Sequence, residues 1–242
     1  MRPILVPTRL WGTMMKTFAR LRSVPTLACV LMAGLAVACA AGSRTVAEPV
    51  QGDAAMTISP EAEGVTQIVT AAHVAAWGRT HSDPGALIMA ARILAEVPVR
   101  PGADSGEAVL TPDSLLDEAA TFANGSQGVL DAIARLRTGT RGVRSSPFGQ
   151  GPIFQVREIK ARETYGFEVE ARGGEVLRVA AIGDGDTNID MSVRDEAGAL
   201  VCEDGFGDHY PVCTVQRRQG GKVRIDIVNR GAVWTKVQIL SN

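Results

Sequence analysis

Strong charge of either sign is missing from this chain of 242 residues, and aromatic side chains are scarce. Its 25 basic and 26 acidic residues leave a formal net charge of −1 at pH 7. A protein dedicated to nucleic acid normally has a basic face and an alkaline pI, so nucleic acid is not an expected partner. Because aromatic residues make up 5% of the chain, the core must be built mainly from Val, Ile, Leu and Ala.

The sequence also lacks the short motifs that carry catalysis or nucleotide binding. It contains no nucleophile elbow, P-loop, His-Glu-x-x-His pair or dinucleotide-binding glycine pattern. Its four cysteines form no Cys-x-x-Cys pair, which argues against a zinc ribbon or a thioredoxin-like motif. We therefore predict no catalytic residue, and a non-catalytic role is favoured over an enzymatic one.

The first 39 residues have the pattern of a secretory signal peptide. A short basic segment precedes an apolar run over residues 24–41, which is the order typical of export signals. The basic residues are Lys16, Arg20 and Arg22. Three methionines are candidate start positions: Met1, Met14 and Met15. The pattern predicts that the rest of the chain lies outside the cytoplasm.

The end of the apolar run allows three interpretations. Ala36-Val37-Ala38-Cys39 resembles a bacterial lipobox, which predicts lipidation of Cys39 and anchoring in the membrane as a periplasmic, outer-membrane or cell-surface lipoprotein. Ala38-Cys39-Ala40 also fits the small-x-small rule of ordinary signal cleavage, which would release a secreted protein. An uncleaved anchor is the third option, because the run is near the lower limit of about 17 residues for spanning a bilayer.

Composition divides the remaining chain into four parts. Residues 40–57 are small and polar without periodicity, which predicts a flexible tether. Residues 58–138 have a helical period, and residues 139–151 are rich in Gly, Ser and Arg, as expected of a linker. From residue 152 to residue 242 the period changes to two, which predicts strands.

Three positions in the helical part combine an N-cap residue with a proline at the first helical position: Ser59-Pro60, Asp83-Pro84 and Thr111-Pro112. In each pair a side-chain oxygen caps free backbone N–H groups, and the proline has no N–H that needs a partner. With apolar residues at helical spacing, these starts and the turn at 124–126 predict helices over 60–77, 84–96, 112–123 and 126–137. Short connections indicate two antiparallel hairpins, with a loop over 99–110 between them.

About eight runs with alternating apolar residues follow, over residues 153–156, 165–169, 177–181, 189–193, 200–203, 212–216, 223–227 and 233–239. One apolar face per strand, with turn signals between strands, is what a two-layer antiparallel sandwich needs. The predicted fold class is therefore α+β, with short helical hairpins followed by a β-sandwich.

The β region resembles the bacterial pre-peptidase C-terminal (PPC) domain. The resemblance lies in the Tyr165-Gly-Phe-Glu-Val strand, the stretch Gly183-Asp-Gly-Asp-Thr-Asn-Ile-Asp-Met and the turn at Asn229-Arg-Gly. It implies a jelly-roll-like sandwich over residues 152–242 of a secreted or exported protein. Several members of that family bind calcium or matrix polymers, so an envelope protein or polymer is an expected partner. No peptidase precedes the domain in this sequence.

An acidic loop leads into one of these strands and suggests calcium as a possible cofactor. Its oxygen-bearing residues are Asp184, Asp186, Asn188 and Asp190, with Asp195 further along. Oxygen ligands of this kind suit Ca²⁺, but Ile189 stands where an EF-hand loop requires glycine. The alternative is an acidic turn whose aspartates accept hydrogen bonds from backbone N–H groups.

Cys202 and Cys213 lie close together in the sequence and are expected to form a disulfide in an oxidising compartment. The alternative is a metal or catalytic site that uses Asp208 and His209. His73 and His81 lack the spacing of a zinc-binding pair on one helix and are interpreted as surface or half-buried residues. Trp77 is interpreted as a core or hairpin-packing residue rather than a platform for a ligand.

The function favoured by the sequence is that of an exported, lipid-anchored, non-catalytic envelope protein with a binding sandwich. One alternative is a hydrolase-associated or enzymatic protein with a site between helices and sandwich. Another is a structural accessory subunit that docks a partner through its helices.

Overall fold

The computed structural model describes residues 55–103, 105–139 and 145–242, and these described residues belong to one compact unit. The predicted signal peptide, with Cys39 and most of the predicted tether, lies outside the described residues. Within the described ranges, no helix has the length and apolar character needed to cross a membrane.

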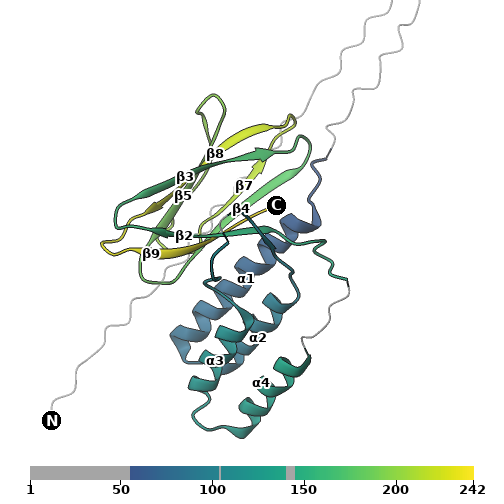
Figure 1. Cartoon of the computed structure of the whole chain (residues 1–242), viewed down its shortest axis with the longest axis vertical. Coiled ribbons are helices and arrows are strands. Elements are labelled where there is room, and N and C mark those ends of the chain that lie inside the picture. The colour runs from purple at the N-terminus through teal and green to yellow at the C-terminus, as the bar shows by residue number, and fades with distance from the viewer. Residues whose placement is uncertain (1–54, 104, 140–144) are drawn as a thin grey trace, which may run out of the picture. The chain divides into compact units, whose positions relative to one another are not determined.

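The four predicted helices are present (Figure 1). They are α1 (Pro60–His81), α2 (Pro84–Ala95), α3 (Pro112–Phe122) and α4 (Gln127–Gly139). The predicted caps account for three starts, because the Ser59 hydroxyl accepts from the Ala62 N–H and Asp83 and Thr111 cap α2 and α3. Helix α1 is longer than predicted and ends at His81, and the capping residue Ser82 that follows has a left-handed conformation.

The β region forms two sheets, as predicted. One has the strand order β1-β2-β9-β4-β7 and the other β3-β8-β5-β6. The strands after β1 are β2 (Ile153–Ile159), β3 (Thr164–Ala171), β4 (Val176–Gly183), β5 (Ile189–Asp195), β6 (Leu200–Asp204), β7 (Val212–Gln216), β8 (Gly221–Asn229) and β9 (Thr235–Ser241). All pairs among these eight strands are antiparallel.

Strand β1 (Arg100–Pro101) was not predicted. It lies in the connection between α2 and α3, which was predicted to be a loop, and it pairs in parallel with Ile153 and Phe154 of β2. A run of two residues has no readable periodicity, so only its position beside β2 makes it a strand. The connection thereby joins the helical part to the edge of the first sheet.

The predicted linker also contacts the helical part where the structure describes it. The Ser146 hydroxyl donates to the Glu96 carbonyl at 3.0 Å. Gly151 has a φ of 77°, and a Cβ there would lie 1.6 Å from the Pro98 carbonyl oxygen. Only glycine combines this backbone conformation with so close an approach.

Two clusters of buried side chains make up the core. The first lies between the two sheets and is formed by strand residues alone, such as Val179, Ile225 and Ile239. The second joins the helices to the outer face of the first sheet, where Ile182 and Leu240 are buried against helical residues. Strands β4 and β9 therefore bury side chains on both faces, and the helices lie against this sheet.

Candidate functional site

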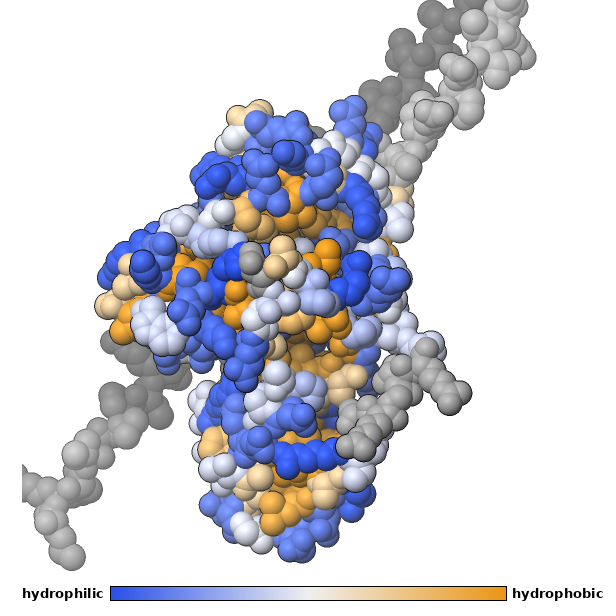
Figure 2. Space-filling view, in the orientation of Figure 1, coloured by the Kyte–Doolittle hydropathy of each residue, from blue (hydrophilic) through white to orange (hydrophobic). Residues whose placement is uncertain are grey.

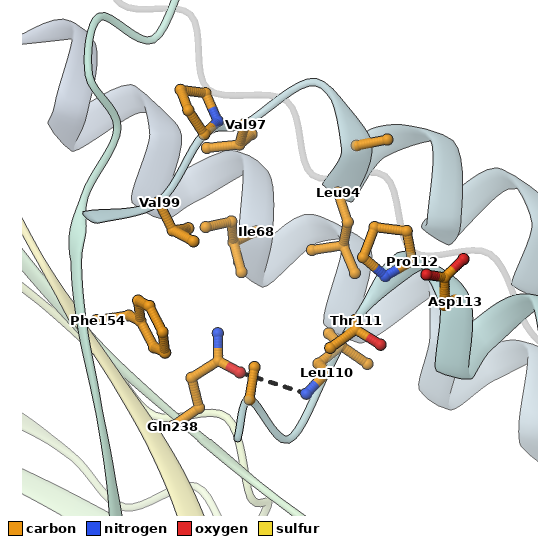
Figure 3. Close-up of a pocket in the computed structure, with 13 residues that line it drawn as sticks. Ile68, Leu94, Val97, Val99, Leu110, Thr111, Pro112, Asp113, Phe154 and Gln238 are labelled. Atoms are coloured by element: carbon orange, nitrogen blue, oxygen red, sulfur yellow. Dashed lines mark hydrogen bonds between the residues drawn. The ribbon is translucent and has the colours of Figure 1, made fainter. Parts of the chain in front are cut away.

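A pocket of about 440 Å³ opens where the helices meet the first sheet. Its walls come from α1, α2, the connection from α2 to α3, the start of α3, and strands β2 and β9 (Figure 3). The residues that line it are Ile68, Leu94, Ala95, Val97, Pro98, Val99, Ala108, Leu110, Thr111, Pro112, Asp113, Phe154 and Gln238. We call it the seam pocket. Its size and apolar lining are those of small-molecule sites.

The fold places apolar side chains around this pocket from distant parts of the chain. Ile68 comes from α1, Leu94 from the last turn of α2 and Phe154 from β2, and all three point toward the same space (Figure 3). Val99 is 43% exposed and stands at the mouth. Apolar surface is also visible on the outside of the molecule (Figure 2).

Gln238 is the buried polar residue of the pocket, with only 3% of its surface exposed. Its Oε1 accepts from the backbone N–H groups of Val109 and Leu110 at 3.1 and 3.3 Å. These two donors determine which end of the amide is the oxygen. The Nε2 group points into the pocket (Figure 3) and donates to no residue in the described part of the chain. The Nε2 atom itself remains accessible to solvent through the pocket. Leaving it unpaired would therefore cost about 1–3 kcal/mol only once a ligand excludes water from it.

The start of α3 forms one side of the mouth. Thr111 and Ser114 make a reciprocal capping box, in which Thr111 Oγ1 accepts from the Ser114 N–H at 3.0 Å and Ser114 Oγ from the Thr111 N–H at 3.1 Å. Asp113 follows in the first turn and is exposed. Its carboxylate is the only full charge among the thirteen lining residues, which include no Lys, Arg or His.

This electrostatic environment favours an uncharged occupant. A helix N-terminus stabilises an anion by about 0.3–1 kcal/mol when exposed, and Asp113 already supplies a negative charge there. Removing an unpaired carboxylate from water costs several kcal/mol. Since no cation lines the pocket, the desolvation cost is the larger effect.

A second, more polar pocket of about 290 Å³ lies on the other side of the Val109–Leu110 segment. Arg79 Nε and Nη2 donate to the two carboxylate oxygens of Glu118, both at 2.7 Å, and this pairing raises the pKa of Arg79. Burial raises the pKa of the Tyr210 phenol beside them. The Arg79 and Glu118 charges are thus engaged with each other.

Two of the three histidines flank Tyr210 near this polar pocket. The His209 ring lies 3.8 Å and the His73 ring 5.5 Å from the Tyr210 ring, measured between centroids. Burial lowers the pKa of His209, because desolvation disfavours the imidazolium form. The third, His81, stacks on Trp77 at 4.2 Å. Trp77 is 52% exposed, so it is not a core residue, and the alternative that it packs in the helical hairpin stays a prediction.

The acidic loop after β4 is bonded to the neighbouring strand and turn. Asp184 Oδ1 accepts from the Thr235 hydroxyl at 2.7 Å, and its Oδ2 accepts from the Lys236 N–H at 2.9 Å. Asp190 forms an ion pair with Arg230 at 2.5 Å. Asn229, which is fully buried, accepts from the Thr187 hydroxyl at 2.9 Å. The loop is therefore a structural corner between β4, β5 and β9.

The predicted calcium ligands do not converge on one point. Asp195 lies at the opposite end of β5 from Asp190 and accepts from the Ala197 and Ala199 N–H groups of its own turn. Asp186 is exposed, and Asn188 Oδ1 is buried without a partner among the described residues. In the described part of the chain, no group of three or more His, Cys, Asp or Glu side chains is arranged to hold a metal. Calcium binding stays a prediction that this geometry does not support.

The predicted disulfide between Cys202 and Cys213 is present. Cys202 belongs to β6 and Cys213 to β7, which lie at the edges of different sheets. The strands are close in space but are not hydrogen-bonded neighbours, so the bridge ties the two layers of the sandwich together. His209 and Asp208, the other members of the alternative metal site, lie in the loop that the bridge closes.

None of the residues that line the seam pocket was predicted as a site. The available signal was the closing strand, where Gln238 interrupts the apolar residues Val237, Ile239 and Leu240. Alternation with Val237 and Ile239 alone would place Gln238 on a solvated face. Leu240 lies on the same face as Gln238, and an apolar residue there indicates that other elements cover it. Which elements cover it depends on the packing of the helices.

Comparisons with known proteins identify no family for this chain. No known family's sequence profile matches it, and no curated protein matches it. Among solved structures, a de novo designed double-stranded β-helix is 16% identical, with a TM-score of 0.25, and the match covers 37% of this chain and 97% of that chain. PliG from Aeromonas hydrophila, a periplasmic inhibitor of g-type lysozyme, is 14% identical, with a TM-score of 0.28, over 38% of this chain and 86% of that chain. Such similarity indicates no function, and the resemblance to the PPC domain stays a prediction.

Proposed function

We propose that this protein is an exported, lipid-anchored, non-catalytic binding protein of the bacterial envelope, which takes up a small and largely apolar ligand in the seam pocket. The observation that carries the proposal is the pocket itself, with apolar walls and one amide donor, that of Gln238, directed into it. A concave apolar site with few polar groups is the usual form of a ligand site. Each methylene group buried there would contribute about 0.8 kcal/mol.

Two observations support export and anchoring. The N-terminal sequence has a basic segment, an apolar run and a lipobox-like end at Cys39. The disulfide between Cys202 and Cys213 fits an oxidising compartment. Residues 40–54, between Cys39 and the start of the described chain, would act as the spacer between the membrane and the folded part.

A non-catalytic role is supported by the polar pocket, which is where an enzymatic site between helices and sandwich would lie. Its ionisable side chains already have protein partners. Arg79 is paired with Glu118, and Asp184 accepts from Thr235 and Lys236. General acid–base catalysis needs a group free to exchange a proton with a substrate.

The binding proposal is tested with a matched pair of substitutions and the neutral fluorescent probe N-phenyl-1-naphthylamine. Val99 and Val201 are 43% and 40% exposed, but only Val99 lines the pocket. Val99→Trp should obstruct the pocket and weaken probe binding at least about tenfold, whereas Val201→Trp should bind like the wild type. Absence of probe binding to the wild type, or equal effects of the two variants, would refute the proposal.

The anchoring proposal is tested by mass spectrometry of the mature protein. A diacylglyceryl-modified Cys39 at the N-terminus is the expected result, and Cys39→Ala should release the protein from the membrane fraction. A mature chain that begins at an unmodified Ala41 would contradict anchoring and leave a secreted protein.

A second candidate role, docking of an envelope protein or polymer, is favoured by one end of the sandwich. The loops after β6 and β8 lie at this end, since both contact the β4–β5 corner, and they expose Phe206 (94%), Val233 (50%) and Trp234 (56%). Exposed aromatic residues of this kind are typical of interaction sites. If this surface docks a partner, Phe206→Ser with Trp234→Ser should abolish co-purification of envelope material that the wild type retains.

A further inference from the structure

We infer that the seam pocket selects an uncharged acyl compound, such as a medium-chain ester or amide, over the corresponding fatty acid anion. This inference rests on the proposed binding function and names the ligand class of the same site. Three features of the pocket support it: the charge at its mouth, the fixed donor on its wall and its volume.

The charge at the mouth opposes an anion. Asp113 carries the only full charge among the lining residues. The N–H groups of Ser114 and Leu115 are already bonded to Thr111, so the capping box reduces what the start of α3 offers to an incoming carboxylate. A carboxylate inside the pocket would therefore lose its hydration without gaining a cation.

The donor on the wall requires an acceptor on the ligand. Gln238 has its Oε1 held by the N–H groups of Val109 and Leu110, so its amide cannot turn over without losing both bonds. Its Nε2 therefore faces the pocket in one defined position (Figure 3). A carbonyl oxygen satisfies this donor, whereas a pure hydrocarbon leaves it unpaired.

The volume sets the size of the ligand. About 440 Å³ corresponds to roughly 15 water molecules at about 30 Å³ each. This space accommodates a medium acyl chain with a small head. The apolar walls from Ile68, Leu94 and Phe154 suit the chain, and the amide of Gln238 suits the carbonyl group.

The experiment is displacement of N-phenyl-1-naphthylamine from the full chain by three matched competitors at pH 7. Methyl octanoate has the chain and a neutral acceptor, octanoate adds a charge, and nonane lacks the acceptor. We expect methyl octanoate to compete at least about tenfold better than octanoate or nonane. Phosphatidylcholine vesicles serve as a further competitor, and displacement by the vesicles as well as the ester would identify membrane lipid as a source of the acyl group.

Two substitutions test the individual features. Asp113→Asn should improve the displacement of the probe by octanoate several-fold and leave its displacement by methyl octanoate unchanged. Asp117→Asn, an exposed control in the same helix, should change the displacement by neither compound. Gln238→Glu keeps an acceptor for the N–H groups of Val109 and Leu110 but removes the donor. It should weaken the binding of methyl octanoate at least about tenfold. Because Gln238→Glu risks misfolding, the decisive comparison is that of Asp113→Asn with Asp117→Asn, both at exposed positions.

The inference is overturned if octanoate competes as well as methyl octanoate, or if Asp113→Asn and Asp117→Asn have the same effect. In both cases probe binding by the wild type would remain, so the proposed binding function would stand. If the wild type does not bind the probe, the proposed function fails before the ligand class is tested.

Discussion

The sandwich encloses its core between its own two sheets, whereas the helices complete theirs against the outer face of one sheet. Ile225 and Ile227 are fully buried among strand residues. Ile68 and Leu87, by contrast, belong to a cluster that includes Ile182 and Leu240 from the strands. The helices therefore depend on the sandwich for burial, and short alanine-rich helices gain most of their stability from such packing.

The difference also explains where the pocket lies. Two sheets of one sandwich have matching alternation and pack closely. The helices meet the sheet through side chains of unequal size, from Ala95 and Ala108 to Phe154, and leave space between them. The candidate site therefore belongs to the seam, and neither region contains it alone.

Separating the two regions should have the largest effect. A fragment of residues 145–242 should keep a cooperative thermal transition, because its core and disulfide remain intact. A fragment of residues 55–139 should show none, because it loses the strand half of its core. Circular dichroism on heating measures both. A cooperative transition in the helical fragment would contradict the predicted dependence.

Substitutions of two neighbouring residues on β9 test the two core clusters one at a time. Ile239 points into the sandwich and Leu240 toward the helices. Ile239→Ala should lower the free energy of unfolding of the whole protein by about 2–5 kcal/mol, as measured by urea denaturation. Leu240→Ala should act mainly on the helices, so hydrogen exchange should accelerate in α1 and remain slow in β5 and β8. Equal acceleration in both regions would show that they unfold as one unit.

The disulfide should matter to the sandwich more than to the helices. It closes a loop with a sequence separation of 11 residues between the two sheets. Replacing Cys202 and Cys213 by Ala should lower the free energy of unfolding by about 3 kcal/mol in the chain-entropy model. A reducing agent should destabilise the wild type similarly and leave the double variant unchanged. No difference between wild type and variant would mean that the bridge does not constrain the unfolded chain.

The smallest expected effect is a pH dependence at the contact between the regions. Burial lowers the pKa of His209, while Asp208 and Asp184 act to raise it and Arg79 and His73 to lower it further. The stability from neutral His209 is therefore fully present above the unfolded-state pKa, about 6.5, and is lost as the pH falls through the lower folded-state pKa.

His209→Gln should reduce this pH dependence, measured as the free energy of unfolding between about pH 8 and pH 5. Substitution of the exposed His81, which stacks on Trp77 in α1, serves as the control. If the wild type and His209→Gln lose stability in parallel, another group is responsible for the change.

Local chemistry predicted the elements well. The oxygen of Ser59, Asp83 or Thr111 before a proline defined three helix starts, because capping requires only residues within the next turn. The strands followed from alternation at period two. The turn from Asp195 to Gly198 is also made by local contacts, since Asp195 accepts from the Ala197 N–H and Gly198 has a positive φ. The pairing of Cys202 with Cys213 was predicted from position and compartment.

Long-range relations were not predicted. Strand β1, the placement of β6 and β7 in different sheets, and the exposure of Trp77 depend on which element lies beside which. The acidic loop illustrates the same point. Asp184 and Asp190 have the spacing of metal ligands, but their partners Thr235 and Arg230 lie 51 and 40 positions away in the sequence. Those partners make the loop a structural corner.

The amino-acid order alone was enough for an α+β chain with an export-type N-terminus, four capped helices and an antiparallel sandwich, since each of these follows from contacts between near neighbours. The packing of the helices on β4 and β9 decided the rest. Through that packing Gln238, one polar residue in an apolar strand, became a donor held in place and directed into a pocket. Such a site exists only when side chains from five separate segments pack together, and a local sequence pattern does not predict contacts between distant segments.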